Sequence, residues 1–361
     1  MNNKLLLVTV IITLIIIFLV GLWPLSFHPK NEVEWLQNSN GVSFYGRGIT
    51  YTGSFNLKSS LLHNNPITFE ILLEPFRATK SDAGHFLSFY DGKEIEIIAF
   101  RQWKSTLEIF RSFPDSRIRL RDALISNEKR LITVSSEKEG TKIYLNGNFA
   151  KFYPNFSLIA NSEIAAQLIL GNSPSGKSPW KGNIFGIAIY NHSLAQDKVF
   201  QHYQAWTKGE AALLKKEEPI ALYLFDEQKG TSVHNQAGQQ NPLLMPSTFQ
   251  MLQKHILDTP LKDFRIKALH FQDIFINIIG FIPLGFFFSA LFNKSKFFSK
   301  NSISFITLLL GSLISLSIEL IQVYLPTRNS SLTDLICNIF GTFLGIVLFR
   351  LIILHSHPRP P

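Results

Sequence analysis

The chain has 361 residues, enough for two structural units, and it is apolar for that length, with 46% hydrophobic and 17% charged residues. The formal net charge is +9, but the lysines and arginines are spread singly or flank apolar segments. No basic stripe with interleaved aromatics occurs, which argues against nucleic acid as a partner. The single cysteine, Cys337, excludes disulfides and any cysteine-based metal site.

The first apolar segment runs from Leu5 to Trp23, carries no charge and follows Lys4. Its length and positive flank fit both a signal peptide and an uncleaved anchor. A cleavable peptide needs small residues after the apolar stretch, and Gly21-Leu22-Trp23-Pro24-Leu25 lacks a small-x-small pattern. We therefore expect residues 1–24 to form a transmembrane anchor helix.

Short alternating strands separated by turn residues characterise the next segment, residues 41–210. Strands are predicted at 66–73, 85–90, 130–134 and 141–145. Asn146-Gly147 follows the last of these and is a strong hairpin signal, because both residues tolerate positive φ. Such spacing predicts a β-sandwich. In the linker over 211–270, the strand-like stretch 221–231 is expected to pair with an edge of the sandwich or to form a short hairpin.

Four stretches together resemble the concanavalin A-like (laminin-G-like) jelly-roll family: 68–70, 142–147, 168–172 and 180–190. Some members of that superfamily are β-glucanases with a Glu-x-Asp-x-x-Glu strand. The nearest stretch here, Glu94-Ile95-Glu96, lacks the central Asp and the third acid, and glycoside hydrolysis needs two opposed carboxylates. Trp103 and Trp180 are interpreted as core residues in preference to sugar platforms. The resemblance thus implies a module that binds glycans or proteins, or acts as a spacer.

Three further apolar segments, 272–292, 303–325 and 332–354, are each close to the ~20 residues that cross ~30 Å of hydrocarbon. Positive charges in short loops predict their direction. These charges are Lys294, Lys296 and Lys300 between the second and third spans, Arg350 and Arg359 in the tail, and Lys4. Both termini are therefore expected in the cytoplasm, with residues 25–270 outside. The predicted fold class is mixed, a four-helix transmembrane bundle plus an extracytoplasmic all-β jelly-roll sandwich.

Polar residues occur in pairs on the last three spans, three or four positions apart, so that each pair lies on one helix face. With the predicted direction, the pairs reach one level in the outer leaflet. Ionisable groups in hydrocarbon usually mark a site, although interhelical hydrogen bonds worth ~0.6 kcal/mol each are the structural alternative. The candidate ligand-binding site comprises Asp273, Asn277, Glu319, Gln322, Arg328, Asp334 and Asn338.

Residues 273–285, 319–322 and 326–345 resemble the VanZ-like family, whose domain would cover 271–355. The resemblance implies a polytopic protein of bacterial membranes. The namesake of the family is associated with low-level resistance to teicoplanin, a lipid-tailed glycopeptide that acts at the outer surface. Small residues then serve close helix packing, with a kink at the proline: Gly280, Pro283, Gly285, Gly341 and Gly345.

These features favour a bacterial inner-membrane protein that binds an outer-leaflet lipid or lipid-linked envelope amphiphile. An enzyme acting on a lipid-linked phosphate or ester is the alternative, with Glu319 and Asp334 as acid and base. A purely anchoring role is the third reading. No cofactor is expected, and no histidine-based metal cluster, because His270 lies at the opposite membrane face from His355 and His357. A divalent ion between the carboxylates stays open.

Overall fold

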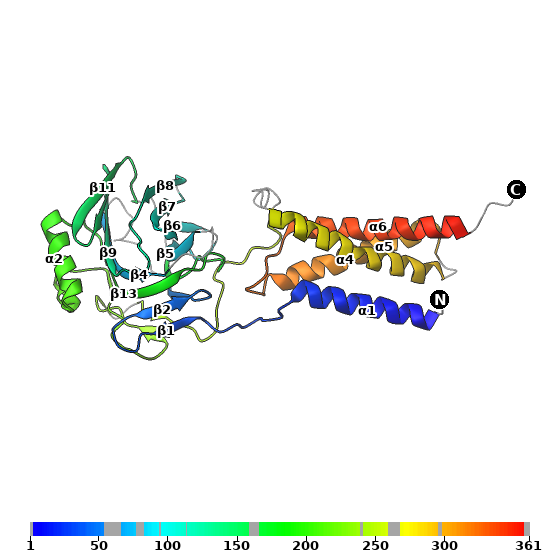
Figure 1. Cartoon of the computed structure of the whole chain (residues 1–361), viewed down its shortest axis with the longest axis horizontal. Helices are drawn as coiled ribbons and strands as arrows, with labels where there is room; N and C mark the ends of the chain where they lie inside the picture. Colours follow the sequence, from blue (N-terminus) through cyan, green and yellow to red (C-terminus); the bar gives the residue numbers. More distant parts are fainter. Residues whose placement is uncertain are drawn as a thin grey trace. The chain divides into compact units, whose positions relative to one another are not determined.

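The computed structural model describes residues 3–53, 66–76, 83–93, 95–112, 114–158, 166–238, 241–258, 268–294 and 298–356. Two compact units divide the chain: Pro29–Gln253, and Met1–His28 together with Lys254–Pro361. We call them the sandwich unit and the helical unit (Figure 1). Glu94, Lys296, His357 and Arg359, and the side chain of His270, lie outside the described part.

Two antiparallel sheets form the sandwich unit (Figure 1), which confirms the predicted fold. The first sheet contains, in spatial order, β1 (Val33–Trp35), β2 (Val42–Tyr45), β13 (Lys181–Tyr190), β4 (Ile67–Pro75), β9 (Arg130–Glu137), β10 (Gly140–Leu145) and β11 (Asn148–Pro154), and β14 (Ala221–Tyr223) also pairs with β13. The second contains β15 (Ser232–Val233), β16 (Leu243–Leu244), β3 (Thr50–Thr52), β12 (Gln167–Leu170), β5 (Gly84–Tyr90), β6 (Glu96–Trp103), β7 (Thr106–Arg111) and β8 (Ser116–Leu120).

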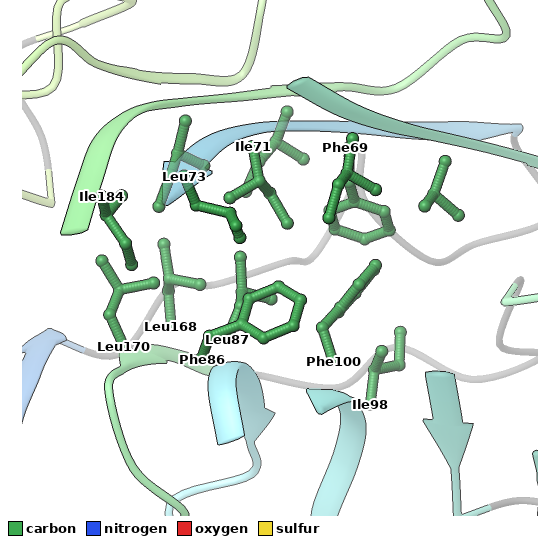
Figure 2. Packing of buried hydrophobic residues seen from close by; sticks show 14 of the residues in the cluster. Phe69, Ile71, Leu73, Phe86, Leu87, Ile98, Phe100, Leu168, Leu170 and Ile184 are labelled. Atoms are coloured by element: carbon green, nitrogen blue, oxygen red, sulfur yellow. The ribbon is translucent and has the colours of Figure 1, made fainter. Parts of the chain in front are cut away.

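The hydrophobic core lies between the two sheets, because alternate residues of each strand point to the same side. Figure 2 shows Phe69, Ile71 and Leu73 of β4 opposite aromatic and aliphatic side chains of the second sheet. The rings of Phe69 and Phe100 meet edge to face with centroids 5.2 Å apart. Trp180 belongs to this core at 2% exposure, as the sequence indicated, but the same interpretation is wrong for Trp103, which is exposed at the end of β6.

The hairpin predicted at Asn146-Gly147 joins β10 to β11. Both turn residues have positive φ, 50° and 78°, the combination that a two-residue type I′ turn requires. The Asn146 side chain also accepts a hydrogen bond from the Leu131 amide at 2.9 Å, which ties the turn to β9.

Helix α2 (Gln196–Thr207) covers the outer face of the first sheet, and a 3₁₀ helix, η1 (Ala211–Glu217), follows it. The fully buried carboxylate of Glu70 on β4 holds the helix in place. It accepts hydrogen bonds from Trp206 Nε1 at 3.0 Å and from Tyr190 Oη at 3.4 Å, and it lies 3.0 Å from His202 Nδ1. Burial, followed by the charge of Glu70, raises the pKa of Tyr190.

Strands β14 to β16 lie beyond residue 210 and still belong to the sandwich. Strand β2 pairs with β13 only as far as Ile184, so the edge of β13 from Ile187 to Ile189 is free to pair with β14. Strands β15 and β16 form a small hairpin that extends the second sheet beside β3. The predicted linker thus supplies both an edge strand and a hairpin.

The two ends of the sandwich unit are paired with each other. Phe249 donates its amide to the Pro29 carbonyl at 2.8 Å, and Asn31 donates its amide to the Ser247 carbonyl at 3.1 Å. The buried Asn31 side chain adds hydrogen bonds to the carbonyls of Ile49 and Pro246. The chain therefore enters and leaves this unit at neighbouring points.

The helical unit contains α1 (Asn3–Leu22), α4 (Ala268–Asn293), α5 (Lys300–Gln322) and α6 (Leu332–Ser356) (Figure 1). Within the described residues, these four helices are long and apolar enough to cross a membrane, in agreement with the four predicted spans. Ser299 begins α5 as its N-cap, because its side chain accepts a hydrogen bond from the Ser302 amide at 3.2 Å. Helix α6 packs most extensively against α4.

Candidate functional site

Helices α4 and α6 approach each other until their backbones touch, at three glycines. A Cβ atom on Gly285 would lie 2.9 Å from the Thr342 carbonyl carbon and closer still to its oxygen. On α6, a Cβ on Gly341 or Gly345 would run into the carbonyl oxygen of Ile278 or Ile282. Only glycine fits such contacts, which is the small-residue packing typical of membrane helices.

Gly280 differs from the other glycines that the sequence singled out. No described heavy atom lies within 4 Å of the position that its Cβ would occupy, and it lies on an exposed face of α4. It therefore makes no close packing contact, because the helix turns this position away from its neighbours. Pro283 lies inside α4, where it supplies no backbone donor.

A stripe of small and polar residues on α5 was missed by the sequence reasoning. Thr307, Gly311, Ser315 and Glu319 are all buried and follow one another at intervals of four. A Cβ on Gly311 would lie 2.6 Å from the side chain of Thr342 on α6. The interval of four is the signal that could have revealed the stripe, because it places the residues on one helix face.

Glu319 is the most buried of the described acids in the helical unit, at 1% exposure. Its carboxylate accepts a hydrogen bond from the Ser331 amide at 2.7 Å and another from the Ser330 hydroxyl. Ser331 is the residue before α6, and its carbonyl accepts the Leu335 amide. Glu319 on α5 therefore caps the N-terminus of α6, where a negative charge is favourable.

Asp334 lies in the first turn of α6 and interacts electrostatically with Glu319. Asn338 follows one turn later, is 4% exposed, and donates a hydrogen bond to Ser315 Oγ at 2.9 Å. Gln322, 7% exposed, donates to the carbonyl of Gly21 on α1 at 2.8 Å. The side-chain oxygens of Asn338 and Gln322 are buried without a hydrogen-bond partner among the described residues.

We call Glu319, Gln322, Asp334 and Asn338 the acceptor cluster. It comes from the end of α5 and the start of α6. An unpaired buried acceptor costs ~1–3 kcal/mol, so two amide oxygens of this kind are unusual in a packed helix interface. Two carboxylates and two amide oxygens make a site that attracts hydrogen-bond donors and positive charge.

Arg328 has a different environment from the one the sequence suggested. Its Nε and Nη2 atoms donate to the carbonyls of Trp23 at 2.8 Å and Val20 at 3.1 Å, at the end of α1. A cation is favourable there, because helix C-termini present unpaired carbonyls. Among the described side chains it makes no ion pair with Glu319 or Asp334. Arg328 thus connects α1 to the loop between α5 and α6.

The two predicted site residues on α4, Asp273 and Asn277, make no hydrogen bond to the acceptor cluster within the described part of the chain. Asp273 is exposed and Asn277 is half-buried. The described hydrogen bonds therefore connect Glu319 and Asn338 across α5 and α6, whereas Gln322 is bonded to α1 and neither residue of α4 is bonded to the cluster.

A segment just before α4 reaches the N-terminus of α6, which the sequence did not reveal. Asp258 donates its amide to the Ser330 carbonyl at 3.0 Å, and its carbonyl accepts the Leu332 amide at 3.1 Å. His255 Nδ1 lies 3.9 Å from the Asp258 carboxylate. The contacts of Asp258 are backbone pairings, so no side-chain pattern predicts them.

No group of three or more His, Cys, Asp or Glu placed to hold a metal occurs among the described residues.

Comparisons with known structures concern the sandwich unit. A structure of botulinum neurotoxin type C, whose cell entry depends on interaction with two ganglioside molecules, has a TM-score of 0.39 and 10% identity, covering 49% of this chain and 46% of that one. The binding domain of botulinum neurotoxin DC in complex with rat synaptotagmin II has a TM-score of 0.40 and 10% identity, and the match covers 49% of this chain and 46% of that one. A Ruminococcus gnavus sialidase CBM40 bound to α2,3-sialyllactose has a TM-score of 0.34 and 14% identity, and the match covers 46% of this chain and 95% of that one.

The chain thus spans less than half the length of the toxin chains that it resembles. None of the curated proteins compared matches the sequence. A family model described as VanZ/LLP1 matches residues 220–354. The match begins at the strands β14 to β16 of the sandwich unit and continues through α4, α5 and α6. The C-terminal part of the chain, over residues 220–354, is therefore a VanZ-like domain.

Proposed function

We propose that the helical unit binds the head group of an amphiphile in the outer leaflet, and that the acceptor cluster contacts that head group. The observation that carries the proposal is the pair of buried amide oxygens, on Gln322 at the end of α5 and on Asn338 near the start of α6, that have no hydrogen-bond partner among the described residues. Ionisable groups within membrane helices usually serve a ligand or a transport path. Their apolar surroundings suit the acyl chains of a lipid.

The chemistry of the cluster favours a ligand rich in hydrogen-bond donors. Carboxylates and amide oxygens only accept hydrogen bonds, and Arg328 is already bound to α1. An ammonium head group or the hydroxyls of a lipid-linked sugar would satisfy these acceptors. A phosphate without donors would be repelled by Glu319 and Asp334.

Helix capping by Glu319 is the competing explanation, and it accounts for only part of the cluster. The carboxylate of Glu319 needs only the amide of Ser331 and the hydroxyl of Ser330 to act as a cap. The oxygens of Gln322 and Asn338 take no part in it, and they would cost stability if they stayed unpaired. A bound head group gives these oxygens a role.

The setting of this site follows from the predicted direction of the spans. We place both termini in the cytoplasm of a bacterium and residues 25–270 outside its inner membrane, so that the acceptor cluster faces the outer leaflet. The sandwich unit then acts as a module that binds envelope glycans or proteins. A contribution to resistance against lipid-tailed glycopeptides follows from competition for, or masking of, the same amphiphiles.

Native mass spectrometry of co-purified lipids tests the proposal. We expect the wild type to retain a defined donor-bearing lipid that is lost in Asn338→Leu and in Glu319→Gln. Ser289→Ala is the matched control, because Ser289 is also buried without a partner among the described residues but lies outside the acceptor cluster. Identical lipid spectra from all four folded proteins would favour helix capping and remove the proposed site.

A further inference from the structure

The sandwich unit has an open side where the two sheets end. Strand β8 is the last strand of the second sheet and β11 is the last strand of the first. Tyr153 on β11 donates its hydroxyl to the Arg119 carbonyl on β8, which ties the two edges together. A cavity of about 550 Å³ opens at this edge, lined by Trp103, Thr106, Arg119, Leu120, Arg121 and Lys151.

The lining of this edge cavity is positively charged. Arg119, Arg121 and Lys151 contribute three cations, and the described lining residues include no carboxylate. Arg121 and Lys151 make no ion pair with any described side chain. Cations gathered in a concave surface attract and concentrate anions.

An ion pair fixes the orientation of the Arg119 side chain. Its Nε donates to the buried carboxylate of Glu108 at 2.6 Å. Arg101 lies 3.5 Å from the other oxygen of Glu108 and also donates to Glu96 at 3.2 Å, so the carboxylate is fixed in turn. The terminal nitrogens of Arg119 stay available for a ligand, and a fixed guanidinium binds a carboxylate or phosphate in a defined geometry.

Trp103 supplies an aromatic surface in the same cavity. It ends β6 and is 40% exposed, unlike Trp180 in the core. Lys104, which follows it with φ of 57°, turns the chain towards β7. The Lys104 ammonium lies 5.4 Å and the Arg119 guanidinium carbon 5.7 Å from the Trp103 ring centroid. Trp103 and Arg119 both line the cavity, so the indole and this guanidinium face a common space.

We propose that the edge cavity binds an anionic carbohydrate, with a sugar ring on Trp103 and its carboxylate or phosphate on Arg119, Arg121 and Lys151. The volume is in the range of small-ligand sites, roughly 300–1,000 Å³. A nucleic acid is a poorer fit, because single strands are bound by several aromatics along a basic groove, and this cavity has one. The inference rests on the proposed glycan-binding role of the sandwich and is independent of the acceptor cluster.

The test uses the full-length protein in nanodiscs of zwitterionic phosphatidylcholine, with binding measured by calorimetry. The probes are trigalacturonate, a galactose phosphate, the neutral galactose trimer and an oligothymidylate. We expect the trigalacturonate or the sugar phosphate to bind, with an affinity that falls as salt rises. The stronger of the two identifies carboxylate or phosphate as the anion. Equal affinity for the neutral trimer would overturn the proposal, and so would tighter binding of the oligothymidylate.

Three variants locate the site. Arg121→Gln and Lys151→Gln are each expected to weaken binding about tenfold, because a charge-assisted hydrogen bond is worth ~1.5–3 kcal/mol. Trp103→Ala should have a similar effect through lost stacking. Arg117→Gln is the matched control, since Arg117 carries the same charge as Arg121 and lies on β8, the strand that Arg121 follows, but does not line the cavity.

The outcomes separate this inference from the role on which it rests. Binding of the neutral trimer that all four variants leave unchanged would refute the anionic class and this cavity, but would keep the sandwich as a glycan-binding module. Absence of any carbohydrate binding by the folded protein would refute both. Equal losses in Arg117→Gln and Arg121→Gln would show a general charge effect and would also refute this cavity as the site.

Discussion

Replacing Gly285 by alanine probes the tightest contact of the helical unit. The new Cβ would lie 2.9 Å from the Thr342 carbonyl carbon and closer to its oxygen. Both sides of this contact are helix backbone, so no side chain can rotate out of the way. Helices α4 and α6 would have to separate by about 1 Å, and overpacking of this kind costs ~1–3 kcal/mol.

The net effect follows from subtracting the helix propensity that alanine brings. Alanine is favoured over glycine in a helix by up to ~1 kcal/mol. With a steric cost at the upper end of the range, Gly285→Ala should destabilise the helical unit by about 2 kcal/mol. Gly280→Ala is the matched control on the same helix, because its Cβ would meet nothing described within 4 Å, and it should be neutral or stabilising.

The single cysteine provides an assay specific to this unit. Cys337 lies on α6 and is 8% exposed, and the sandwich unit contains no thiol. A maleimide that becomes fluorescent on reaction therefore reports the opening of the helices during a thermal ramp in detergent. We expect the transition temperature to fall for Gly285→Ala and to hold or rise for Gly280→Ala. Equal temperatures for the two variants would refute the backbone contact between α4 and α6.

Three further substitutions have defined outcomes. Glu70→Leu removes the acceptor of Trp206 and Tyr190 and the partner of His202. We expect the free energy of unfolding, measured with denaturant and tryptophan fluorescence, to fall by roughly 3 kcal/mol. A variant as stable as the wild type would contradict the role of Glu70. Arg328→Gln removes hydrogen bonds to the end of α1 and should destabilise the helical unit by about 1–2 kcal/mol. The transition temperature of Cys337 labelling should therefore fall, and an unchanged temperature would contradict this role of Arg328. Burial, the largest single influence, raises the pKa of Glu96, but His85, Ser88 and Arg101 together lower it below its usual 4.5. Its stabilisation is therefore complete above about pH 4.5 and is lost as the pH falls through the folded value; Glu96→Gln should flatten acid unfolding, and an unchanged acid profile would count against this ion-pair network.

The helices and many of the strands could be predicted because their signals are local. Uninterrupted apolar runs indicated the four spans, and Asn146-Gly147 indicated the hairpin between β10 and β11. Spacing on single helices also predicts Glu319, Asp334 and Asn338, which lie where α5 and α6 meet, and Gln322, which contacts α1. Each of these features depends on residues that are close in the sequence.

The features that escaped prediction depend on partners distant in the chain. The edge of β13 that accepts β14 exists only because β2 ends early, and no residue within 221–223 announces this. The sequence predicts Arg328 as part of the candidate ligand-binding site, but its guanidinium donates to two carbonyls at the end of α1. Gly280 shares its residue type with Gly285 and differs only in the direction that its helix face takes.

The adjacent ends of the sandwich unit, held together by Pro29, Asn31, Ser247 and Phe249, have an evolutionary consequence. A domain whose ends meet can be inserted between two helices at little entropic cost, since to the surrounding fold it behaves as a short closed loop. The four-helix unit could thus acquire, exchange or lose such a module without relocating α1 or α4. The same hydrogen bonds between the two ends would be the first to bear a pulling force applied to the segments that join the sandwich unit to α1 and α4. The rest of the sheets would stay unstrained.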